Sequence, residues 1–253
     1  MKSPEAMLLH QRLYESLAET ACLASYRPAN FLSSICFPRG ATVEYLGLFH
    51  EIQAPFEHKP WVETELKKLD IRTVPWKYLG EEDRRLLEEI IENGSCVVRT
   101  NRSDGGVGLT LVHEISQIRD AWFVGSKDQF FGVAPYMLPN IPLNVNACVL
   151  SAVDVDGRNF VSLHSPSLQL IGVPEFTRRH FGYCGNDFAR LNEIIPPEKL
   201  DELESAVIKA GKWLGSKGYL GAFGVDAMLY EDDIYITEIN PRFQGSSDVS
   251  SFI

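Results

Sequence analysis

Hydrophobic residues recur at helical spacing in four segments of the chain. The clearest segment spans residues 196–217, where Leu200, Leu203, Val207, Ala210 and Leu214 repeat at intervals of three and four residues. The same spacing predicts helices over residues 3–21, 60–69 and 81–93. A glycine follows the last of these at the position that commonly ends a helix.

Apolar and β-branched residues bounded by turn residues predict strands over 95–100, 107–113, 130–135, 143–155 and 159–164. Residues 219–230 and 233–240 read as a hairpin across an acidic turn. Weaker signals suggest short strands at 33–37 and 43–48. Residues 172–192 have little periodicity and are predicted to form a long loop with a short helix.

Composition and charge favour a globular protein and argue against nucleic-acid-binding and membrane-spanning proteins. The 253 residues are 45% hydrophobic and 23% charged, which is typical of a globular chain. The excess of 34 acidic over 24 basic residues gives a net charge of −10, which argues against a nucleic-acid partner but permits a small anion held by local cations. No apolar run is long enough to span a membrane, and the five scattered cysteines contain no CxxC pair. A cytoplasmic protein is therefore expected.

The C-terminal hairpin contains the most specific chemical signal. Side chains alternate along a strand, so Glu238 and Asn240 should share a face. A three-residue turn at 231–233 would pair Tyr230 with Ile234 and place Asp226 opposite Glu238. Opposed carboxylates repel unless a cation lies between them, and Mg²⁺ binds carboxylate, amide and phosphate oxygens. The alternative is a pair of solvent-facing carboxylates beside a Lys or Arg, but the addition of Asn240 and Arg242 favours metal and phosphate binding.

A glycine-rich segment lies between two predicted strands. Gly105, Gly106 and Gly108 would let backbone amides approach an anion, and Arg99 and Arg102 add positive charge. A dinucleotide-binding or Walker loop would need a helix after the glycines, whereas a strand follows here. The segment is therefore a strand–loop–strand lid over phosphates or a plain hairpin turn.

The order of these motifs over residues 58–247 resembles the ATP-grasp superfamily, nearest to carboxylate–amine ligases and the carbamoyl-phosphate-synthetase or biotin-carboxylase type. The resemblance implies an α+β fold in which a β-lid subdomain and a larger antiparallel-sheet subdomain grip the nucleotide. It also implies ATP and Mg²⁺ (or Mn²⁺) as cofactors. The metal ligands would be Asp226, Glu238 and Asn240, while Arg242 and Arg99 would act on the phosphates or substrate.

The resemblance carries further binding roles to individual positions. Backbone groups of Pro135, Tyr136 and Met137 would read adenine. Lys59 would supply charge, as would Arg99, which stands where the family usually has Lys. Three more positions resemble nucleotide-contacting segments, although a structural hydrogen-bonding role is an equal alternative for each: Asn146, His164 and Gln169.

The resemblance also predicts three parts and a reaction. Residues 1–55 would be a remnant of an N-terminal α/β domain, 56–135 the lid subdomain and 136–253 the larger subdomain with the metal site. The leading hypothesis is a ligase that activates a small carboxylate as an acyl phosphate for attack by an amine or thiol. The alternative is a non-catalytic or degenerate ATP-binding module, or a fragment of a larger ligase. A homodimer, or a partner chain supplying the N-terminal domain, is expected. Residues 176–187 are the candidate segment for carboxylate recognition.

Overall fold

The computed structural model describes residues 4–16, 20–24, 42–47, 53–56, 58–100, 108–119, 122 and 130–248. Its helices are α1 (Pro4–Ser16), α2 (Gln53–Phe56), α3 (Lys59–Lys68), α4 (Arg84–Glu92), α5 (Leu191–Ile194) and α6 (Pro197–Ser216). Its first strands are β1 (Thr20–Ala24), β2 (Thr42–Leu46), β3 (Lys77–Leu79), β4 (Cys96–Thr100), β5 (Leu109–Val112) and β6 (Phe131–Pro135). The remaining strands are β7 (Asn140–Val153), β8 (Asn159–Leu163), β9 (Ser167–Ile171), β10 (Tyr183–Asp187), β11 (Gly221–Tyr230) and β12 (Asp233–Asn240).

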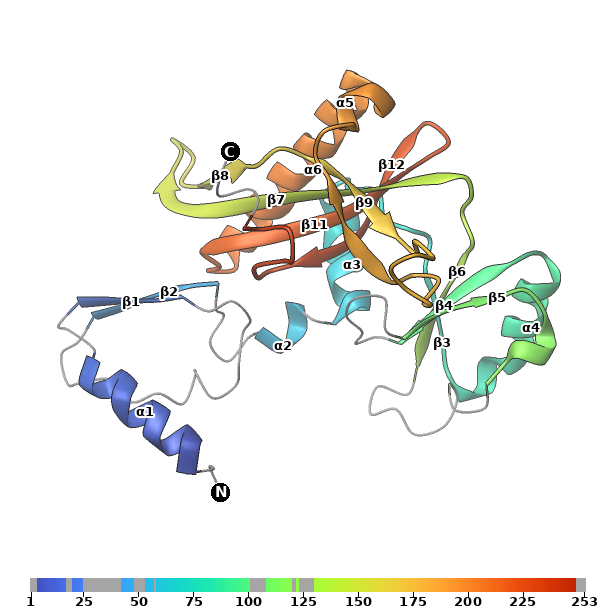
Figure 1. Ribbon diagram of the computed structural model, residues 1–253, viewed down its shortest axis with the longest axis horizontal. Helices are drawn as coiled ribbons and strands as arrows, with labels where there is room; N and C mark the ends of the chain where they lie inside the picture. Colours follow the sequence, from blue (N-terminus) through green and yellow to red (C-terminus); the bar gives the residue numbers. More distant parts are fainter. Residues whose placement is uncertain are drawn as a thin grey trace.

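The strands form three sheets (Figure 1). Six strands make an antiparallel sheet in the order β10–β9–β7–β11–β12, with β8 paired to β7. Four strands make a second antiparallel sheet in the order β3–β6–β4–β5. Strands β1 and β2 form a separate parallel pair beside α1 (Figure 1). The α+β fold expected from the sequence is confirmed by this architecture.

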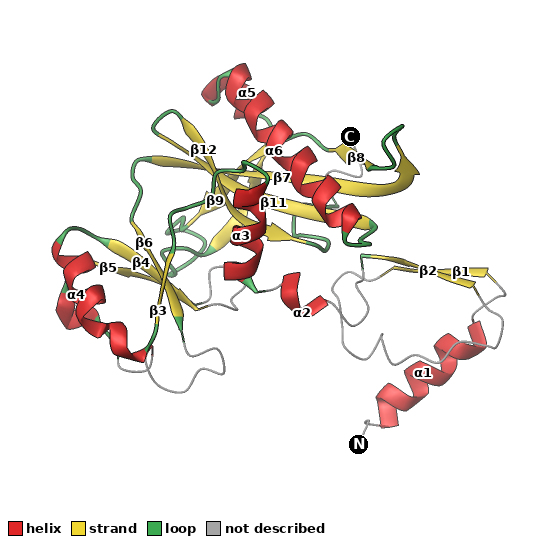
Figure 2. Ribbon diagram, turned by 180° about the vertical axis from the view of Figure 1, so that it is seen from behind, coloured by secondary structure: helices red, strands yellow, loops and turns green. Residues whose placement is uncertain are grey.

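The main hydrophobic core lies between the six-stranded sheet and helices α3 and α6, which cover one of its faces (Figure 2). Leu203, Val207 and Leu214 of α6 are fully buried against strand residues such as Phe223 and Val225. These helix positions are the periodic apolar residues of the sequence, because one stripe of an amphipathic helix must be removed from water.

A second core stabilises the four-stranded sheet. Leu87 and Ile91 of α4 pack against Val98, Val112 and Val133 on strands β4, β5 and β6. The two larger sheets therefore each bury their own apolar residues. A third, smaller cluster connects the two sheets, because Ala134 of β6 and the nearby Met137 pack with Met228 and Tyr230 of β11.

Most of the predicted elements are present within a few residues of their expected ends, including α3, α4, α6 and both strands of the last hairpin. The segment 172–192 was predicted as a long loop with a short helix, but it contains strand β10, and the short helix α5 begins only at its end. Strand β10 includes Gly185, Asn186 and Asp187, which have low strand propensity, so its pairing with β9 depends on tertiary context. Helix α1 ends at Ser16, and the strand expected at 33–37 lies outside the described residues.

None of the helices that the structure describes is long and apolar enough to cross a membrane.

We predict that Gly211→Ala destabilises the protein, although alanine is the better helix former by about 1 kcal/mol. A Cβ atom at Gly211 would lie 2.8 Å from Phe223 Cζ and 2.8 Å from Val161 Cγ2, where α6 crosses the sheet. Overpacking of this kind costs about 1–3 kcal/mol. Urea denaturation should therefore show a lower midpoint. Ser205→Ala, at an exposed position of the same helix, is the matched control and should not lower the midpoint.

Candidate functional site

A pocket of about 340 Å³ lies between the six-stranded and four-stranded sheets. One end is apolar and is lined by Val74, Trp76, Val97, Leu109, Ala134, Met137 and Met228. The other end is polar and is lined by Asn144, Gln169, Asp226, Glu238, Asn240, Arg242 and Gln244. An apolar cleft with a few convergent polar groups is the usual form of a small-molecule site.

The β11–β12 hairpin places Asp226 opposite Glu238, as the sequence predicted. The route to this pairing differs from the prediction. The turn has two residues, with Glu231 in the left-handed region at φ 54°, so Tyr230 pairs with Asp233. The register then shifts by one between Asp226 and Ala227, and this β-bulge restores the predicted pairing of the two carboxylates.

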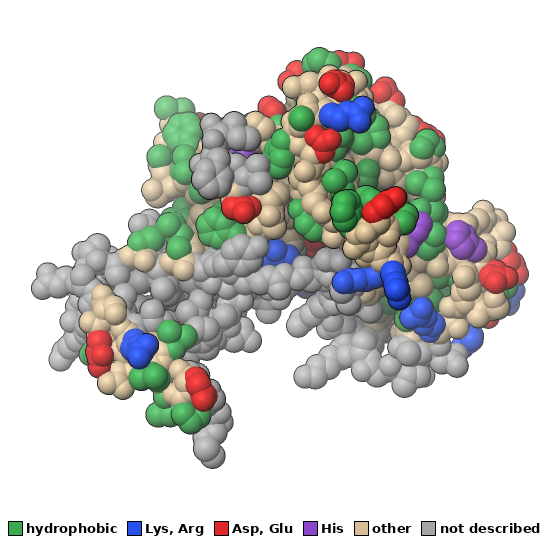
Figure 3. All heavy atoms as spheres, viewed as in Figure 1, with side chains coloured by type: hydrophobic (Ala, Val, Ile, Leu, Met, Phe, Trp, Pro, Cys, Tyr) green, Lys and Arg blue, Asp and Glu red, His purple; other side chains and the backbone are tan. Residues whose placement is uncertain are grey.

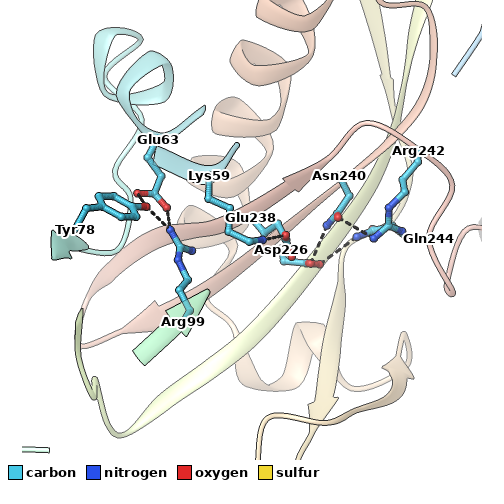
Figure 4. A network of polar contacts seen from close by, with 9 residues as sticks. All are labelled: Lys59, Glu63, Tyr78, Arg99, Asp226, Glu238, Asn240, Arg242 and Gln244. Carbon is cyan, nitrogen blue, oxygen red and sulfur yellow. Dashed lines mark hydrogen bonds and ion pairs between the residues drawn. The ribbon is translucent and has the colours of Figure 1, made fainter. Parts of the chain in front are cut away.

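Amide groups surround the Asp226 carboxylate (Figure 4). Its Oδ1 accepts hydrogen bonds from Asn144 Nδ2 and Gln169 Nε2, each at 2.8 Å, and from Gln244 Nε2 at 3.4 Å. Its Oδ2 accepts a hydrogen bond from Asn240 Nδ2 at 3.1 Å. These donors come from four different elements, so the carboxylate is the point at which they converge.

Burial, and then the nearby negative charge of Glu238, raise the pKa of Asp226 to about 6. The hydrogen bonds from Asn144 and Gln244 and the charge of Arg242 act in the opposite direction. The raised pKa means that the ionised carboxylate is unfavourable in this environment compared with water. A further positive charge at this position would therefore stabilise the ionised form.

Lys59, at the first position of α3, forms an ion pair with Glu238 Oε1 (Figure 4). The lysine side chain is 12% exposed and the glutamate side chain 31% exposed, so the pair lies at the edge of the buried region. This contact joins α3 to β12. Lys59, which the sequence predicted to supply positive charge, therefore contacts Glu238, a predicted metal ligand. Glu238 lines the pocket, whereas Lys59 does not.

Arg242 follows β12 and lines the polar end of the pocket. Its Nη2 donates a hydrogen bond to Asn240 Oδ1 at 3.0 Å. Asn240 therefore bridges Arg242 and Asp226, because its amide nitrogen bonds the aspartate while its oxygen accepts from the arginine. The three side chains form one connected network.

The donor set fits a hard divalent cation. Asp226 and Glu238 supply two carboxylates and Asn240 supplies an amide oxygen, and Mg²⁺ is commonly held by one or two carboxylates together with substrate phosphates. Among the residues that the structure describes, no group of three or more His, Cys, Asp or Glu side chains could hold a metal ion. A cation here would depend on these three residues and on oxygens of a bound ligand.

Arg99 does not line the pocket, although the sequence suggested that it faces the phosphates. Its side chain is 4% exposed, forms an ion pair with Glu63 of α3 and donates to Tyr78 Oη at 2.6 Å (Figure 4). Its guanidinium carbon lies 3.8 Å from the ring centroid of Trp76. Arg99 Nε and Trp76 Nε1 are buried and have no hydrogen-bond partner in the described structure. The cluster is therefore buried but not fully satisfied.

The predicted adenine-reading segment lies at the apolar end of the pocket. Pro135, Tyr136 and Met137 all line it, and Tyr136 N donates to Ser95 O at 2.9 Å. The backbone of this segment is thus fixed to the turn before β4. Its position agrees with the sequence-based expectation, while its contact with a base stays a prediction.

The other predicted residues are divided between the pocket, the protein interior and the segments that are not described. Gln169 lines the pocket. Asn146 is buried and bonds Ser246 and Ser247, and neither Asn146 nor His164 lines the pocket. Gly108 does not line it either. Arg102, Gly105 and Gly106 lie outside the described residues.

Sequence reasoning missed Asn144 and Gln244. Asn144 is 1% exposed, and the alternation of Asn144 and Asn146 inside the apolar strand β7 was the available signal for a polar inner face. No sequence pattern marked Gln244. Its side chain lies over Gly224, where a Cβ atom would overlap the Gln244 amide. The absence of a side chain at Gly224 therefore creates the space in which Gln244 contacts Asp226.

Comparison with known proteins agrees with this geometry. Residues 153–246 match the family described as the ATP-grasp domain. The chain is 24% identical over 182 residues to the formate-dependent phosphoribosylglycinamide formyltransferase of Wigglesworthia glossinidia brevipalpis, a match that covers 70% of this chain and 41% of that protein. The chain thus spans about two fifths of this relative.

Solved structures show the same fold. Biotin carboxylase from Campylobacter jejuni matches with a TM-score of 0.69 and 18% identity over 98% of this chain and 54% of the other. N5-carboxyaminoimidazole synthetase from Staphylococcus aureus, complexed with ADP, matches with a TM-score of 0.65 and 15% identity over 100% and 61%. D-alanyl-alanine synthetase A from Vibrio cholerae matches with a TM-score of 0.61 and 20% identity over 85% and 63%. These likenesses confirm the predicted ATP-grasp fold.

We predict that Gly224→Ala displaces the Gln244 side chain and lowers stability by about 1–3 kcal/mol, because the new methyl group would overlap the amide. Truncation of the glutamine should relieve this overlap. The double variant Gly224→Ala/Gln244→Ala should therefore lose less stability than the sum of the two single variants, as a double-mutant cycle in urea would measure. Additive losses would show that the two positions do not interact.

Proposed function

We propose that this chain, which belongs to the ATP-grasp superfamily, is the nucleotide-binding part of a ligase that phosphorylates a small carboxylate for attack by an amine or thiol. The observation that carries the proposal is the opposition of Asp226 and Glu238 at the polar end of a pocket whose other end is apolar. Like charges directly opposite each other on paired strands are destabilising. The two carboxylates therefore do not stabilise the fold, and a ligand that binds them would explain their position.

The lining of the pocket has the mixture of apolar and charged residues that a nucleotide requires. Its apolar end would hold the adenine against Trp76, Met137 and Met228, with the backbone of 135–137 at the edge of the base. The phosphates would then extend towards Asp226 and Arg242 at the polar end. This orientation removes the apolar base from water and brings the anionic groups to the charged residues.

Asp226, Glu238 and Asn240 would hold Mg²⁺ at the polar end. The ion, when bound, supplies charge neutralisation and orientation for phosphate oxygens. Arg242 would contribute a second positive charge and would donate hydrogen bonds to a phosphate or to the substrate. In this chemistry the protein mainly positions the reactants and stabilises developing charge, so no side-chain nucleophile is required.

Arg99 would act on the nucleotide only after a change of partner. In the described structure its charge is neutralised by Glu63 and its guanidinium stacks on Trp76. The unpartnered Nε groups of Arg99 and Trp76 support a rearrangement, because buried donors without acceptors are costly. We therefore assign Arg99 a positioning role behind Trp76, which lines the pocket, and propose that it contacts phosphate only after this rearrangement.

The names of the similar proteins are consistent with this reaction class. The sequence relative is formate-dependent, and formate is a carboxylate. One solved structure is named a D-alanine–D-alanine ligase, from Helicobacter pylori.

A non-catalytic ATP-binding module, or a fragment of a larger ligase, is the second candidate. The buried position of Arg99, away from the pocket, favours it. In that case a partner chain or a second copy would supply the acceptor site. Release of ADP from Mg-ATP in the presence of pooled carboxylates and amines would separate the candidates, because a binding module gives no turnover.

We predict that Glu238→Gln reduces the increase in melting temperature that Mg-ATP causes. The substitution keeps an oxygen ligand but removes one negative charge from the proposed metal site. A tenfold loss of affinity corresponds to about 1.4 kcal/mol less stabilisation by saturating ligand. The melting temperatures of the two proteins should be compared with Mg-ATP, with ATP and excess chelator, and without ligand.

The ligand-free measurement is needed because Glu238→Gln also weakens the ion pair with Lys59. Only the ligand-induced shift tests the metal site. Glu198→Gln, at an exposed position of α6, is the matched control and should keep the full shift. Equal shifts in wild type and Glu238→Gln would eliminate Glu238 as a metal ligand.

A further inference from the structure

The connection between β9 and β10, residues 172–182, contacts the apolar end of the pocket. This β9–β10 loop lies at the end of a hairpin on the edge of the six-stranded sheet and extends towards the four-stranded sheet (Figure 1). In Figure 3, exposed His, Lys and Arg side chains gather on the face where this hairpin approaches the four-stranded sheet. Within the segment 176–187, which the sequence suggested for carboxylate recognition, only Phe181 and Tyr183 line the pocket. The segment therefore presents aromatic rings to the cavity.

Tyr136 is held from both of the larger sheets. It follows β6 directly, and its backbone N donates to Ser95 O at 2.9 Å, in the turn before β4 of the four-stranded sheet. Its hydroxyl group is hydrogen-bonded at 2.7 Å to Nε2 of His180, which belongs to the β9–β10 loop of the six-stranded sheet. The four-stranded sheet thus fixes the backbone of Tyr136, while the β9–β10 loop fixes its side chain.

Three aromatic rings pack against one another at this end of the pocket. The ring centroids are 5.7 Å apart for Tyr136 and His180, 6.2 Å for Tyr136 and Phe181, and 4.7 Å for His180 and Phe181. All three pairs meet edge to face, which is a favourable geometry for aromatic side chains. Tyr136 and Phe181 line the pocket, whereas His180 does not. His180 can therefore act on a ligand only through these two neighbours.

The backbone of the β9–β10 loop fixes the position of His180. Gly172 N donates to Gly182 O at 2.8 Å across the base of the loop. Gly172 has φ 65°, and a Cβ atom there would lie 2.1 Å from the carbonyl oxygen of His180. Glycine is therefore required at position 172 both for its backbone conformation and for the close approach of His180.

We propose that His180 is a positioning residue of the nucleotide pocket: it holds the Tyr136 ring against Phe181 and so forms the wall at the base end before the ligand binds. A wall that is already ordered loses less conformational freedom on binding than a mobile one, and this difference increases affinity. The wall consists of aromatic rings, which suit the planar base of a nucleotide. This inference rests on the proposed function, because it assigns a role within the same pocket.

Calorimetry of the full chain with Mg-ATP and with Mg-tripolyphosphate tests this role, because tripolyphosphate has the phosphates but no base. His180→Ala should bind Mg-ATP about two- to tenfold more weakly than wild type and Mg-tripolyphosphate with unchanged affinity. His180→Gln keeps a polar group that can bond the Tyr136 hydroxyl and should retain most of the affinity for Mg-ATP. Glu175→Ala, at an exposed position of the same loop, is the matched control and should bind both probes as wild type does.

A double-mutant cycle isolates the contact between His180 and Tyr136. Tyr136→Phe removes only the hydroxyl group and should also weaken the binding of Mg-ATP. His180→Ala should then cost less affinity in the Tyr136→Phe background than in wild type, because the hydrogen bond is already absent. Additive losses of affinity would overturn the positioning role.

Gly172→Ala tests the loop without changing either side chain of the contact. The new methyl group would displace the backbone at His180, so affinity for Mg-ATP should fall as it does in His180→Ala. Gly157→Ala is the matched control, because Gly157 also has a positive φ, 74°, but a Cβ atom there would meet nothing within 4 Å. This control shares the backbone strain and should keep the affinity of wild type.

The outcomes separate this inference from the proposed function. Wild-type affinity for Mg-ATP in His180→Ala would overturn the positioning role and leave the function in place. Equal losses of affinity for Mg-ATP and Mg-tripolyphosphate would do the same, because the effect would then not depend on the base. Failure of wild type to bind Mg-ATP would overturn the proposed function and the inference together.

Discussion

The pairing of Asp226 with Glu238 across the β11–β12 hairpin is the constraint on which the polar end of the pocket depends. Both residues belong to strands that pack on the main core, so burial of their apolar neighbours fixes the carboxylates in place. Burial, and then the charge of Glu238, raise the pKa of Asp226, so the ionised pair is costly in this environment. The two-residue turn alone would not pair these residues. The β-bulge shifts the register by one residue and so places Asp226 opposite Glu238.

The surrounding residues reduce the cost of these charges without removing them. Asn144, Gln169 and Asn240 donate to Asp226, and Lys59 pairs with Glu238. The amides are uncharged, so they orient the aspartate while leaving its negative charge available. A lysine in place of one of these amides would neutralise the site. Asp226 is thus surrounded by uncharged amides, and only Glu238 is paired with a cation. This arrangement suits a site in which a bound cation neutralises the remaining negative charge.

The sequence predicted the periodic elements because they follow from local rules, as helix α6 follows from an apolar stripe. The Asp226–Glu238 pair was predicted from a three-residue turn, whereas the structure reaches the same pair through a two-residue turn and a β-bulge that no local pattern marked. Strand β10 could not be predicted, since its residues become a strand only through pairing with β9. The Gln244 contact and the burial of Arg99 depend on packing between segments far apart in the chain, which no local pattern encodes.

Under the proposed function, Lys59 and Arg99 can contact a nucleotide only if their ion pairs with Glu238 and Glu63 are broken. Glu238 cannot give its full charge both to Lys59 and to a metal ion. A cation that takes Glu238 as a ligand would weaken the pair with Lys59, and the lysine would then be free to contact an anionic oxygen nearby. The same carboxylate thus links metal binding to the release of a positive charge at the start of α3. Arg99 and Glu63, 36 residues apart in sequence and nearly buried, provide a second pair of this kind between α3 and β4. Lys59 and Glu63 both belong to α3, and their partners belong to β12 of the six-stranded sheet and β4 of the four-stranded sheet. Helix α3 therefore links the two sheets through ion pairs next to the site.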